Sequence, residues 1–304
     1  MRSEIKFDVP ILFLIFNRPG ATKKVIDEIK KIRPDQLFIA SDGAREYKDK
    51  EKEIVEDLRK QVLASIDWEC NIKTLFRSDN LGCKLAVSGA IDWFFDNVEQ
   101  GIILEDDCLP SESFFSFCRE MLERYKDEEQ IMSICGYNIL GSYACPDSYI
   151  FSKYFYSWGW ATWKHAWQKI DISFDKYQEA KDIGDLEKYY PSFIERKIRS
   201  RKIDHCVKGR VNSWAIPWNV SHQMTNSLAI IPKVNLIENI GFSNDFSTHT
   251  QENLWDKNFL YHKPSNLSFP LNHPKEVKEN KKFLSKFLLR ESQRIILKKL
   301  KLHF

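Results

Sequence analysis

The first 125 residues alternate between short apolar runs and longer segments whose apolar residues recur at helical spacing. The first run, residues 9–16, contains no charged residue, as expected of a strand buried on both faces of a parallel sheet. Four strand–helix pairs in succession predict a doubly wound α/β sheet with helices on both faces. The predicted strands are 9–16, 37–40, 72–76 and 102–104, and the predicted helices fall within 21–33, 54–62, 85–94 and 111–125.

Polar or charged residues follow each of these predicted strands directly. Right-handed crossovers bring the carboxyl ends of parallel strands to one edge of a sheet, where α/β proteins bind their ligands. We therefore expect one site built from four strand ends, at residues 17–19, 41–43, 77–82 and 105–107.

The fourth strand ends in three adjacent carboxylates, Glu105, Asp106 and Asp107. Three neighbouring like charges repel one another unless a positive charge lies beside them. Carboxylate oxygens are preferred ligands of hard divalent cations, so the segment predicts a Mn²⁺ or Mg²⁺ site that bridges the phosphates of a ligand. The alternation of side chains along a strand predicts that Glu105 and Asp107 share one side and Asp106 takes the other. The alternative is a charged turn on the surface.

Beyond residue 130 the pattern is less regular, with strands predicted at 131–135, 149–156 and within 227–241. Four of the nine tryptophans, at positions 158, 160, 163 and 167, lie within ten residues of one another. We expect Trp163 and Trp167 in the core and Trp158 or Trp160 at a pocket, where an aromatic face can stack on a sugar ring. Because no linker rich in Pro, Gly or Ser interrupts the chain, residues 1–275 are predicted to form one unit.

Charge and cysteine content indicate the compartment. The seven cysteines are odd in number and widely spaced, which predicts reduced thiols in a cytoplasmic protein. The N-terminal apolar run lacks the cleavage pattern of a signal peptide, and no apolar run reaches the length of a membrane-spanning helix. Residues 281–304 hold six Lys, two Arg and one Glu and are therefore strongly basic. Because the net charge of the whole chain is only +3, the rest of the chain is net negative.

The basic tail, residues 276–304, carries leucines, isoleucines and phenylalanines among its lysines. This composition is typical of a segment that lies on a membrane surface. We therefore expect peripheral association with the inner face of the membrane and no binding of nucleic acid. The alternatives are a helix that binds a partner, a nucleic-acid contact and a plain solvated tail.

Two common phosphate-binding fingerprints are absent from the sequence. It contains neither Gly-x-Gly-x-x-Gly nor a loop ending in Gly-Lys-Ser/Thr, which argues against a dinucleotide oxidoreductase and an ordinary ATPase. A bound diphosphate would therefore depend on a metal ion and on basic side chains. Arg18, Arg77 and Lys84 are the candidates for those side chains.

Three stretches resemble GT-A-fold glycosyltransferases, whose nucleotide-binding half is Rossmann-like. The similarity is to the N-acetylglucosaminyltransferase I family and to bacterial hemolysin-like glycosyltransferases. Residues 10–12 with Asn17 and Arg18 resemble the first strand and its nucleotide loop. Residues 104–107 with Pro110 and residues 114–115 resemble the Asp-x-Asp metal segment in its Glu-Asp-Asp form, and Gly159 and Trp160 with Trp167 resemble a loop that lines the sugar pocket.

The resemblance implies a division of the chain and a role for each matching residue. It implies a nucleotide-sugar-binding half at 1–140, an acceptor-side half at 141–275 and the tail at 276–304. Asp107 would coordinate Mn²⁺ or Mg²⁺, with His249 as a last ligand, and the ion would neutralise the leaving nucleoside diphosphate. Glu105 and Asp106 would lie beside the ribose and the donor sugar, and Asp42 would contact the nucleotide base. Asn17 and Arg18 would hold the nucleotide, and the diphosphate would be bordered by Arg77, Asn80 and Gly82. The residues expected to contact the sugar are Trp158, Gly159, Trp160 and Trp214.

The sequence differs from the family pattern at the position of the general base. The family has an aspartate between two tryptophans, whereas Trp214 is followed here by Ala215. Because an acceptor hydroxyl must lose its proton, Asp204, Glu238 and Asp245 remain as candidate bases. Whether the reaction inverts or retains the anomeric configuration stays open.

These observations predict a metal-dependent hexosyl- or N-acetylhexosaminyl-transferase. The donor would be a nucleoside-diphosphate sugar, UDP-linked, and the acceptor a saccharide or lipid-linked saccharide in cell-surface polysaccharide synthesis. One alternative is a sugar-1-phosphate nucleotidyltransferase, although residues 16–20 lack the glycine-rich basic loop of that class. The other alternative is a tryptophan-rich, non-enzymatic carbohydrate-binding protein.

Overall fold

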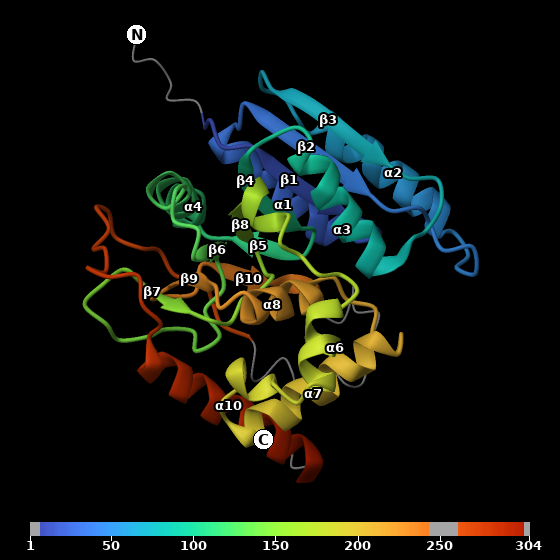
Figure 1. Ribbon diagram of the computed structural model, residues 1–304. Helices are drawn as coiled ribbons and strands as arrows, with labels where there is room; N and C mark the ends of the chain where they lie inside the picture. Colours follow the sequence, from blue (N-terminus) through green and yellow to red (C-terminus); the bar gives the residue numbers. More distant parts are fainter. Residues whose placement is uncertain (1–6, 243–260, 301–304) are drawn as a thin grey trace.

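The structure, a computed structural model, describes residues 7–242 and 261–300. Its centre is an eight-stranded mixed sheet with the strand order β3-β2-β1-β4-β8-β6-β9-β7 (Figure 1). The strands of the sheet are β1 (Ile11–Ile15), β2 (Gln36–Ser41), β3 (Asn71–Phe76), β4 (Gln100–Glu105), β6 (Ile131–Cys135), β7 (Tyr149–Ser152), β8 (Trp160–Trp163) and β9 (Leu228–Pro232). The predicted α/β fold class is confirmed.

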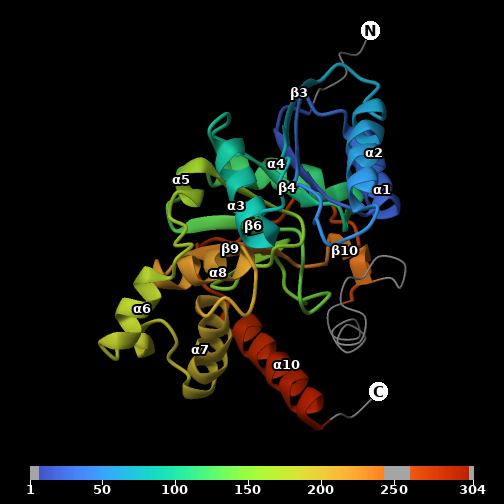
Figure 2. The ribbon, with the colours of Figure 1, turned by 90° about the vertical axis from the view of Figure 1, so that its right-hand side faces the viewer.

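The first four strands are mutually parallel and follow the predicted alternation. The helices α1 (Pro19–Ile32) and α2 (Glu51–Ala64) cover one face, and α3 (Gly82–Phe95) covers the other (Figure 2). In the register, Leu14 of β1 lies beside Glu105 of β4 and Ile15 lies beside Ser41 of β2. The predicted polar strand ends are therefore brought to one edge.

The strand β8 is the main departure from the sequence-based expectation. Gly159 and Trp160 were expected in a loop, but Trp160 begins a strand that pairs antiparallel with both β4 and β6. A short separate pair lies beside it, formed by β5 (Cys108–Pro110) and β10 (Ile237–Asn239). This pair holds the segment around residue 240 against the carboxylate triplet.

The remaining described helices surround the second half of the sheet. They are α4 (Glu112–Arg124), α5 (Lys164–Trp167), α6 (Asp175–Asp182), α7 (Phe193–Val207), α8 (Ala215–Met224) and α10 (Lys281–Leu300), with the one-turn helices η1 (Leu186–Lys188) and η2 (Ile240–Phe242). A small second core joins α6, α7 and α8 through Tyr177, Ile203 and Val220.

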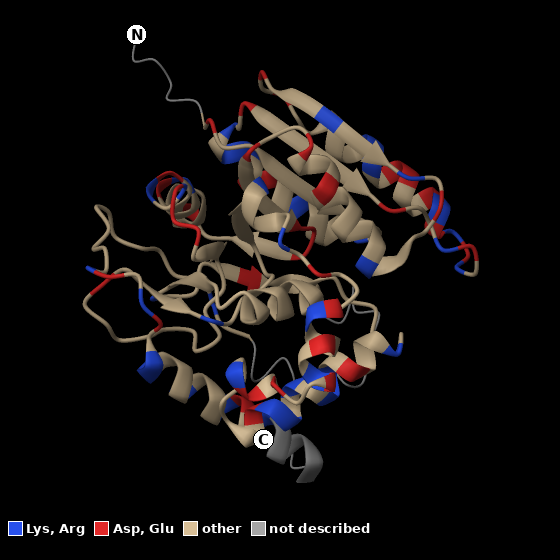
Figure 3. Ribbon diagram, in the orientation of Figure 1, with Lys and Arg blue, Asp and Glu red and all other residues tan. Residues whose placement is uncertain are grey.

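Part of the basic tail is docked against the main core. Phe283 and Phe287 of α10 are 0% and 2% exposed, and α10 lies beside α7 (Figure 1). Lysines and arginines occur on both helices, interspersed with acidic residues (Figure 3). None of the described helices is both long enough and apolar enough to span a membrane. The division of the chain at residue 140 stays a prediction.

Candidate functional site

A cavity of about 260 Å³ lies at the carboxyl edge of the parallel strands. Eight of the residues selected from the sequence line it: Asn17, Arg18, Asp42, Arg77, Asn80, Gly82, Glu105 and Asp106. They come from the four predicted strand ends, as the topology of a doubly wound sheet requires. We call this space the rim cavity.

Arg18 joins the two aspartates of the carboxylate triplet. Its Nη1 atom lies 3.1 Å from Oδ1 of Asp106 and 2.6 Å from Oδ2 of Asp107. Asp106 also accepts a hydrogen bond from the backbone N–H of Phe16. The prediction that Asp106 points away from Asp107 is therefore wrong, because β4 ends at Glu105 and the two aspartates form a turn.

One guanidinium faces three carboxylates, and the pKa values reflect this imbalance. Burial, together with the neighbouring charges of Asp107 and Asp106, raises the pKa of Glu105 to about 8. Burial raises the pKa of Asp106 to about 6, although Arg18 opposes the shift. Burial lowers the pKa of Arg18, but Asp106 and Asp107 outweigh it and hold that pKa above its ordinary value. Among the described residues, the triplet therefore carries more carboxylate groups than the charge of Arg18 can balance.

The donor atoms fit a hard divalent cation. Within residues 7–242 and 261–300, no three His, Cys, Asp or Glu side chains converge on one point. Mg²⁺ is commonly held by one or two carboxylates together with substrate phosphates, so such a convergence is not required. Asp107 is the candidate ligand from this chain. The other predicted ligand, His249, lies outside the described residues.

Asp42 fastens the loops that follow β2 and β3. Its carboxylate accepts hydrogen bonds from the backbone N–H groups of Leu81 and Gly82, at 3.0–3.1 Å, where α3 begins. Asn80 donates from Nδ2 to the carbonyl oxygen of Gly43 at 2.7 Å. A carboxylate has further acceptor sites, so a contact of Asp42 with a nucleotide base stays a prediction.

Two arginines that the sequence analysis did not select also shape this edge. Arg45 lines the rim cavity, binds the carboxylate of Glu51 and lies 5.4 Å from the ring centre of Phe16. Glu51 in turn accepts from Nδ2 of Asn17 at 2.7 Å. Arg59 of α2 donates to the carbonyl oxygens of Asp42 (2.9 Å) and Arg77 (2.8 Å), tying two strand ends together. Arg45 had a signal in the sequence, since it follows Asp42 in the same loop.

Arg77 and Lys84 were both expected to supply charge to a diphosphate. Arg77 lines the cavity and donates from Nη1 to the carbonyl oxygen of Ala86 at 3.1 Å. Lys84 does not line it, and its ammonium lies 5.5 Å from the ring centre of Phe174. The expectation for Lys84 is therefore not met in this conformation, because the backbone of Lys84 is tied to Asn212 and its side chain extends toward α6.

The tryptophans separate into core and cavity residues. Trp160 and Trp214 are buried and stack with their ring centres 5.4 Å apart, so both belong to the core, which corrects the predicted sugar contacts. Trp214 lies beside Glu105 and helps to stabilise the charged form of that carboxyl group. Gly159 is buried against Ile237. Of the four predicted sugar-contacting residues, Trp158 lines a second cavity, and the other three line neither this cavity nor the rim cavity.

The candidate bases lie in different surroundings. Asp204 on α7 pairs with Lys181, whose Nζ atom is 2.7 Å away, and it lines neither cavity. Glu238 on β10 lies opposite Leu109, just beyond the triplet, and accepts from the hydroxyl of Tyr261 at 2.9 Å. Asp245 lies outside the described residues. Among the described candidates, the structure brings Glu238 nearest in the fold to the carboxylates, through the β5–β10 pair.

Comparison with known proteins gives no family. No protein-family model and no curated protein matches the sequence. Among solved structures, the chain is similar to a UDP-glucose pyrophosphorylase complexed with UDP-glucose, at 10% identity and a TM-score of 0.41 over 77% of this chain and 94% of that chain. It is also similar to 4-diphosphocytidyl-2C-methyl-D-erythritol synthase from Anaerococcus prevotii DSM 20548, at 12% identity and a TM-score of 0.34 over 60% and 79% of the two chains. A third similar structure is HddC from Yersinia pseudotuberculosis, at 8% identity and a TM-score of 0.32 over 51% of this chain and 77% of that chain. At these levels the similarities assign neither a family nor an activity.

Proposed function

We propose that the protein is a divalent-metal-dependent glycosyltransferase of the hexosyl- or N-acetylhexosaminyl-transferase class. Its donor would be a UDP-linked sugar bound in the rim cavity. The observation that carries the proposal is the carboxylate triplet, which ends β4 at the carboxyl edge of the sheet with the guanidinium of Arg18 against its charge. The resemblance of the three sequence stretches to GT-A-fold enzymes supports the same reading.

The side chains of this chain divide the work as follows. Asp107 would hold Mn²⁺ or Mg²⁺, and Arg18 keeps it together with Asp106, which lines the cavity. A divalent ion bound there supplies Lewis-acid neutralisation of the charge that develops on the leaving diphosphate. Asp42, Asn80 and Arg59 hold the loops around the nucleotide in place. Such preorganisation is what lets fixed groups stabilise a transition state.

The acceptor would be a saccharide or a lipid-linked saccharide used in cell-surface polysaccharide synthesis. Glu238 is the described candidate for the base that takes the proton of the acceptor hydroxyl. The basic composition of residues 281–304 supports a place at the inner face of an anionic membrane.

Calorimetric titration with UDP tests the proposal. We expect UDP to bind in the presence of Mn²⁺ and to lose most of its affinity after chelation with EDTA. Asp107→Asn should remove the effect of Mn²⁺, whereas Asp27→Asn, at an exposed ion pair on α1, should leave it unchanged. Binding of UDP that is indifferent to Mn²⁺, or equal behaviour of the two variants, would contradict the proposal.

A panel of nucleotide sugars then separates the reaction classes. Slow hydrolysis of one UDP-sugar to UDP and free sugar is expected of a glycosyltransferase that lacks its acceptor. Conversion of that UDP-sugar with pyrophosphate to UTP and a sugar 1-phosphate would instead establish a nucleotidyltransferase. Sugar binding without either reaction would favour the non-enzymatic alternative.

A further inference from the structure

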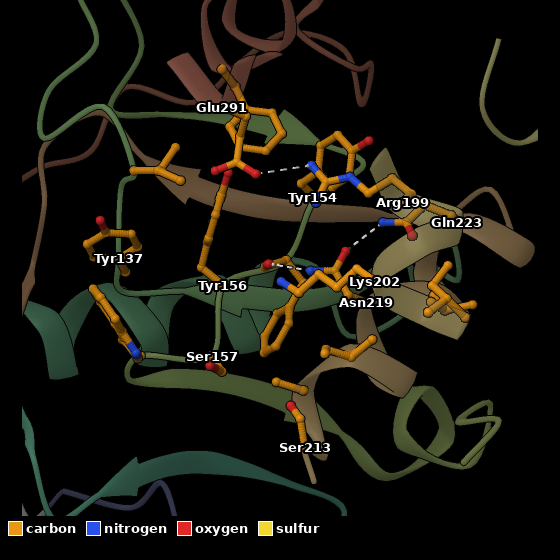
Figure 4. Close-up of a pocket in the computed structure, with 18 of the residues that line it drawn as sticks. Tyr137, Tyr154, Tyr156, Ser157, Arg199, Lys202, Ser213, Asn219, Gln223 and Glu291 are labelled. Atoms are coloured by element: carbon orange, nitrogen blue, oxygen red, sulfur yellow. Dashed lines mark hydrogen bonds and ion pairs between the residues drawn. The ribbon is translucent and has the colours of Figure 1, made fainter. Parts of the chain in front are cut away.

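A second cavity, of about 310 Å³, lies beyond the sheet among α7, α8, α10 and the segment that follows β7 (Figure 4). Its volume falls at the lower end of the range of roughly 300–1,000 Å³ that small-molecule sites occupy. Five separate stretches of chain build its walls, around residues 137–139, 154–158, 190, 199–223 and 287–294. We call it the tyrosine cavity, because Tyr137, Tyr154, Tyr156 and Tyr190 line it.

The charged residues of this cavity are predominantly cationic. Arg199, Lys202 and Arg294 line it together with a single carboxylate, Glu291. Glu291 is shared, since it lies 3.1 Å from Nη1 of Arg294 and 3.8 Å from Nη2 of Arg199. Lys202, on α7, reaches solvent as well as the cavity, and burial lowers the pKa of its ammonium group. The lining therefore carries a surplus of two positive charges, which favours an anionic ligand.

Two buried polar atoms on the cavity wall have no hydrogen-bond partner among the described residues. They are the hydroxyl oxygen of Tyr156 and the Nε atom of Arg199. The Arg199 guanidinium is fixed in place, because it stacks 4.5 Å from the ring centre of Tyr154 and 5.5 Å from that of Phe287. A buried polar group without a partner costs stability, so its presence in a cavity indicates a place for a ligand.

One wall of the cavity is aromatic. The ring of Tyr137 meets the ring of Trp158 with centres 4.5 Å apart and that of Tyr156 with centres 5.7 Å apart. Aromatic faces stack against the apolar C–H faces of sugar rings, and Trp158 was singled out in the sequence for that reason. The cavity thus combines a sugar-binding wall with an anion-binding one.

The segment between α7 and α8 connects this cavity to the rim cavity. Val211, Ser213 and Ala215 line the tyrosine cavity. Between them, Asn212 accepts from the backbone N–H of Lys84 at 2.6 Å, and Trp214 lies beside Glu105. Residues 211–215 therefore line the tyrosine cavity and also contact the start of α3 and the carboxylate triplet.

We propose that the tyrosine cavity binds a sugar that carries an anionic group, either a carboxylate or a phosphate. Arg199 and Lys202 would bind the anion, the Tyr156 hydroxyl would hydrogen-bond it, and Trp158 with Tyr137 would stack on the sugar ring. That this sugar is the acceptor rests on the proposed function, whereas the binding of an anionic sugar does not.

Ligand-observed NMR and calorimetry with three probes test the proposal without any nucleotide. Glucuronate and glucose 1-phosphate should each bind more tightly than glucose, by about tenfold for at least one of them. The better of the two identifies the source of the negative charge. Equal binding of all three probes would overturn the proposal.

Three variants locate the binding. Lys202→Gln should lower the affinity for the preferred anionic sugar about fivefold to tenfold. Lys197→Gln, at an exposed lysine on the same helix outside the cavity, should leave it unchanged. Tyr156→Phe should also weaken it while keeping or raising the melting temperature, because the hydroxyl has no partner to lose. Equal affinities of Lys202→Gln and Lys197→Gln would overturn the proposal.

A failure of the anionic-sugar proposal can be distinguished from a failure of the proposed glycosyltransferase function. UDP binding with Mn²⁺, measured on the same samples, should be unaffected by Lys202→Gln. Loss of UDP binding alone would contradict the glycosyltransferase and leave the anionic-sugar site standing. Loss of anionic-sugar binding alone would contradict this site and leave the donor site standing.

Discussion

The Nη1 atom of Arg18 lies 2.6 Å from Oδ2 of Asp107, across a gap of 89 residues in the sequence. This contact joins the loop after β1 to the turn after β4. Both side chains are largely buried, so the ion pair is screened much less by water and salt than a surface pair. It is the relationship that makes three adjacent carboxylates compatible with a folded chain.

Replacing Arg18 should therefore cost more stability than replacing a surface cation. We expect Arg18→Met to lower the free energy of unfolding by about 2–3 kcal/mol, because it leaves buried carboxylates without their partner. Lys23→Met, at an exposed ion pair on α1, the helix that follows Arg18, should change the free energy of unfolding by no more than about 0.5 kcal/mol. Urea denaturation at neutral pH measures both, and a similar loss in the two variants would contradict the compensating role of Arg18.

Gly241 controls the position of the candidate metal ligand. A Cβ atom at this position would lie 2.4 Å from Oδ2 of Asp107, so the carboxylate would have to move. We expect Gly241→Ala to weaken the Mn²⁺-dependent binding of UDP by roughly 10- to 100-fold, as for other changes that disturb a metal ligand. Gly209→Ala is the matched control, because a Cβ there meets nothing within 4 Å and costs only backbone strain. Unchanged UDP affinity in Gly241→Ala would argue against Asp107 as the ligand.

His222 should make the protein sensitive to acid. Burial lowers the pKa of His222 to about 3, and its Nε2 atom lies 2.8 Å from the hydroxyl of Ser133. An unfolded histidine titrates near 6.5. Between about pH 6.5 and pH 3 the unfolded chain binds a proton that the folded chain excludes, so the stability falls as the pH falls.

The variant His222→Gln isolates this contribution. It should be less stable than the wild type at pH 7, because it loses the packing of the imidazole against Phe155 and Trp218. The difference should then narrow by about 2 kcal/mol on going from pH 7 to pH 4.5. Urea titrations at both pH values give the difference in the free energy of unfolding between the wild type and the variant. A difference that does not change with pH would contradict the conclusion that His222 is buried in its neutral form.

The docking of α10 can be tested on a single helix. Phe287 is 2% exposed and Leu289, two residues further along, is 61% exposed. We expect Phe287→Ala to lower the free energy of unfolding by about 3–5 kcal/mol, as is typical of large core aromatics. Leu289→Ala should change it by no more than about 0.5 kcal/mol. Equal losses would show that this helix does not pack as described.

The sequence predicted the parallel half of the fold because its information is local. An apolar run such as Ile11–Ile15 followed by the amphipathic α1 specifies a strand–helix unit without reference to distant residues. The strand β8 was missed for the opposite reason. Trp160–Trp163 is only four residues long, and its partners lie in β4 and β6. A strand of this kind is defined by its neighbours rather than by its own pattern.

The candidate site shows the same distinction. Asn17, Asp42, Arg77 and Asp106 could be placed together from topology alone, because parallel strands end at one edge. The convergence of Asp106 and Asp107 on Arg18 could not be predicted from topology, because it depends on the residue at which β4 ends. The tyrosine cavity was beyond prediction as well, because α10 contributes Phe287, Glu291 and Arg294 to it from the far end of the chain.

The insertion of β8 beside β4 has a consequence for the nascent chain. The outer edge of β4 pairs with residues that lie about 60 positions further along, Ile103 with Trp160 and Gln100 with Trp163. At translation rates of about 5–20 residues per second, those partners follow roughly 3–12 seconds later. During that interval an apolar strand edge is exposed on the ribosome-bound chain. The protein is therefore expected to engage a holding chaperone at this stage of synthesis, before its sheet is complete.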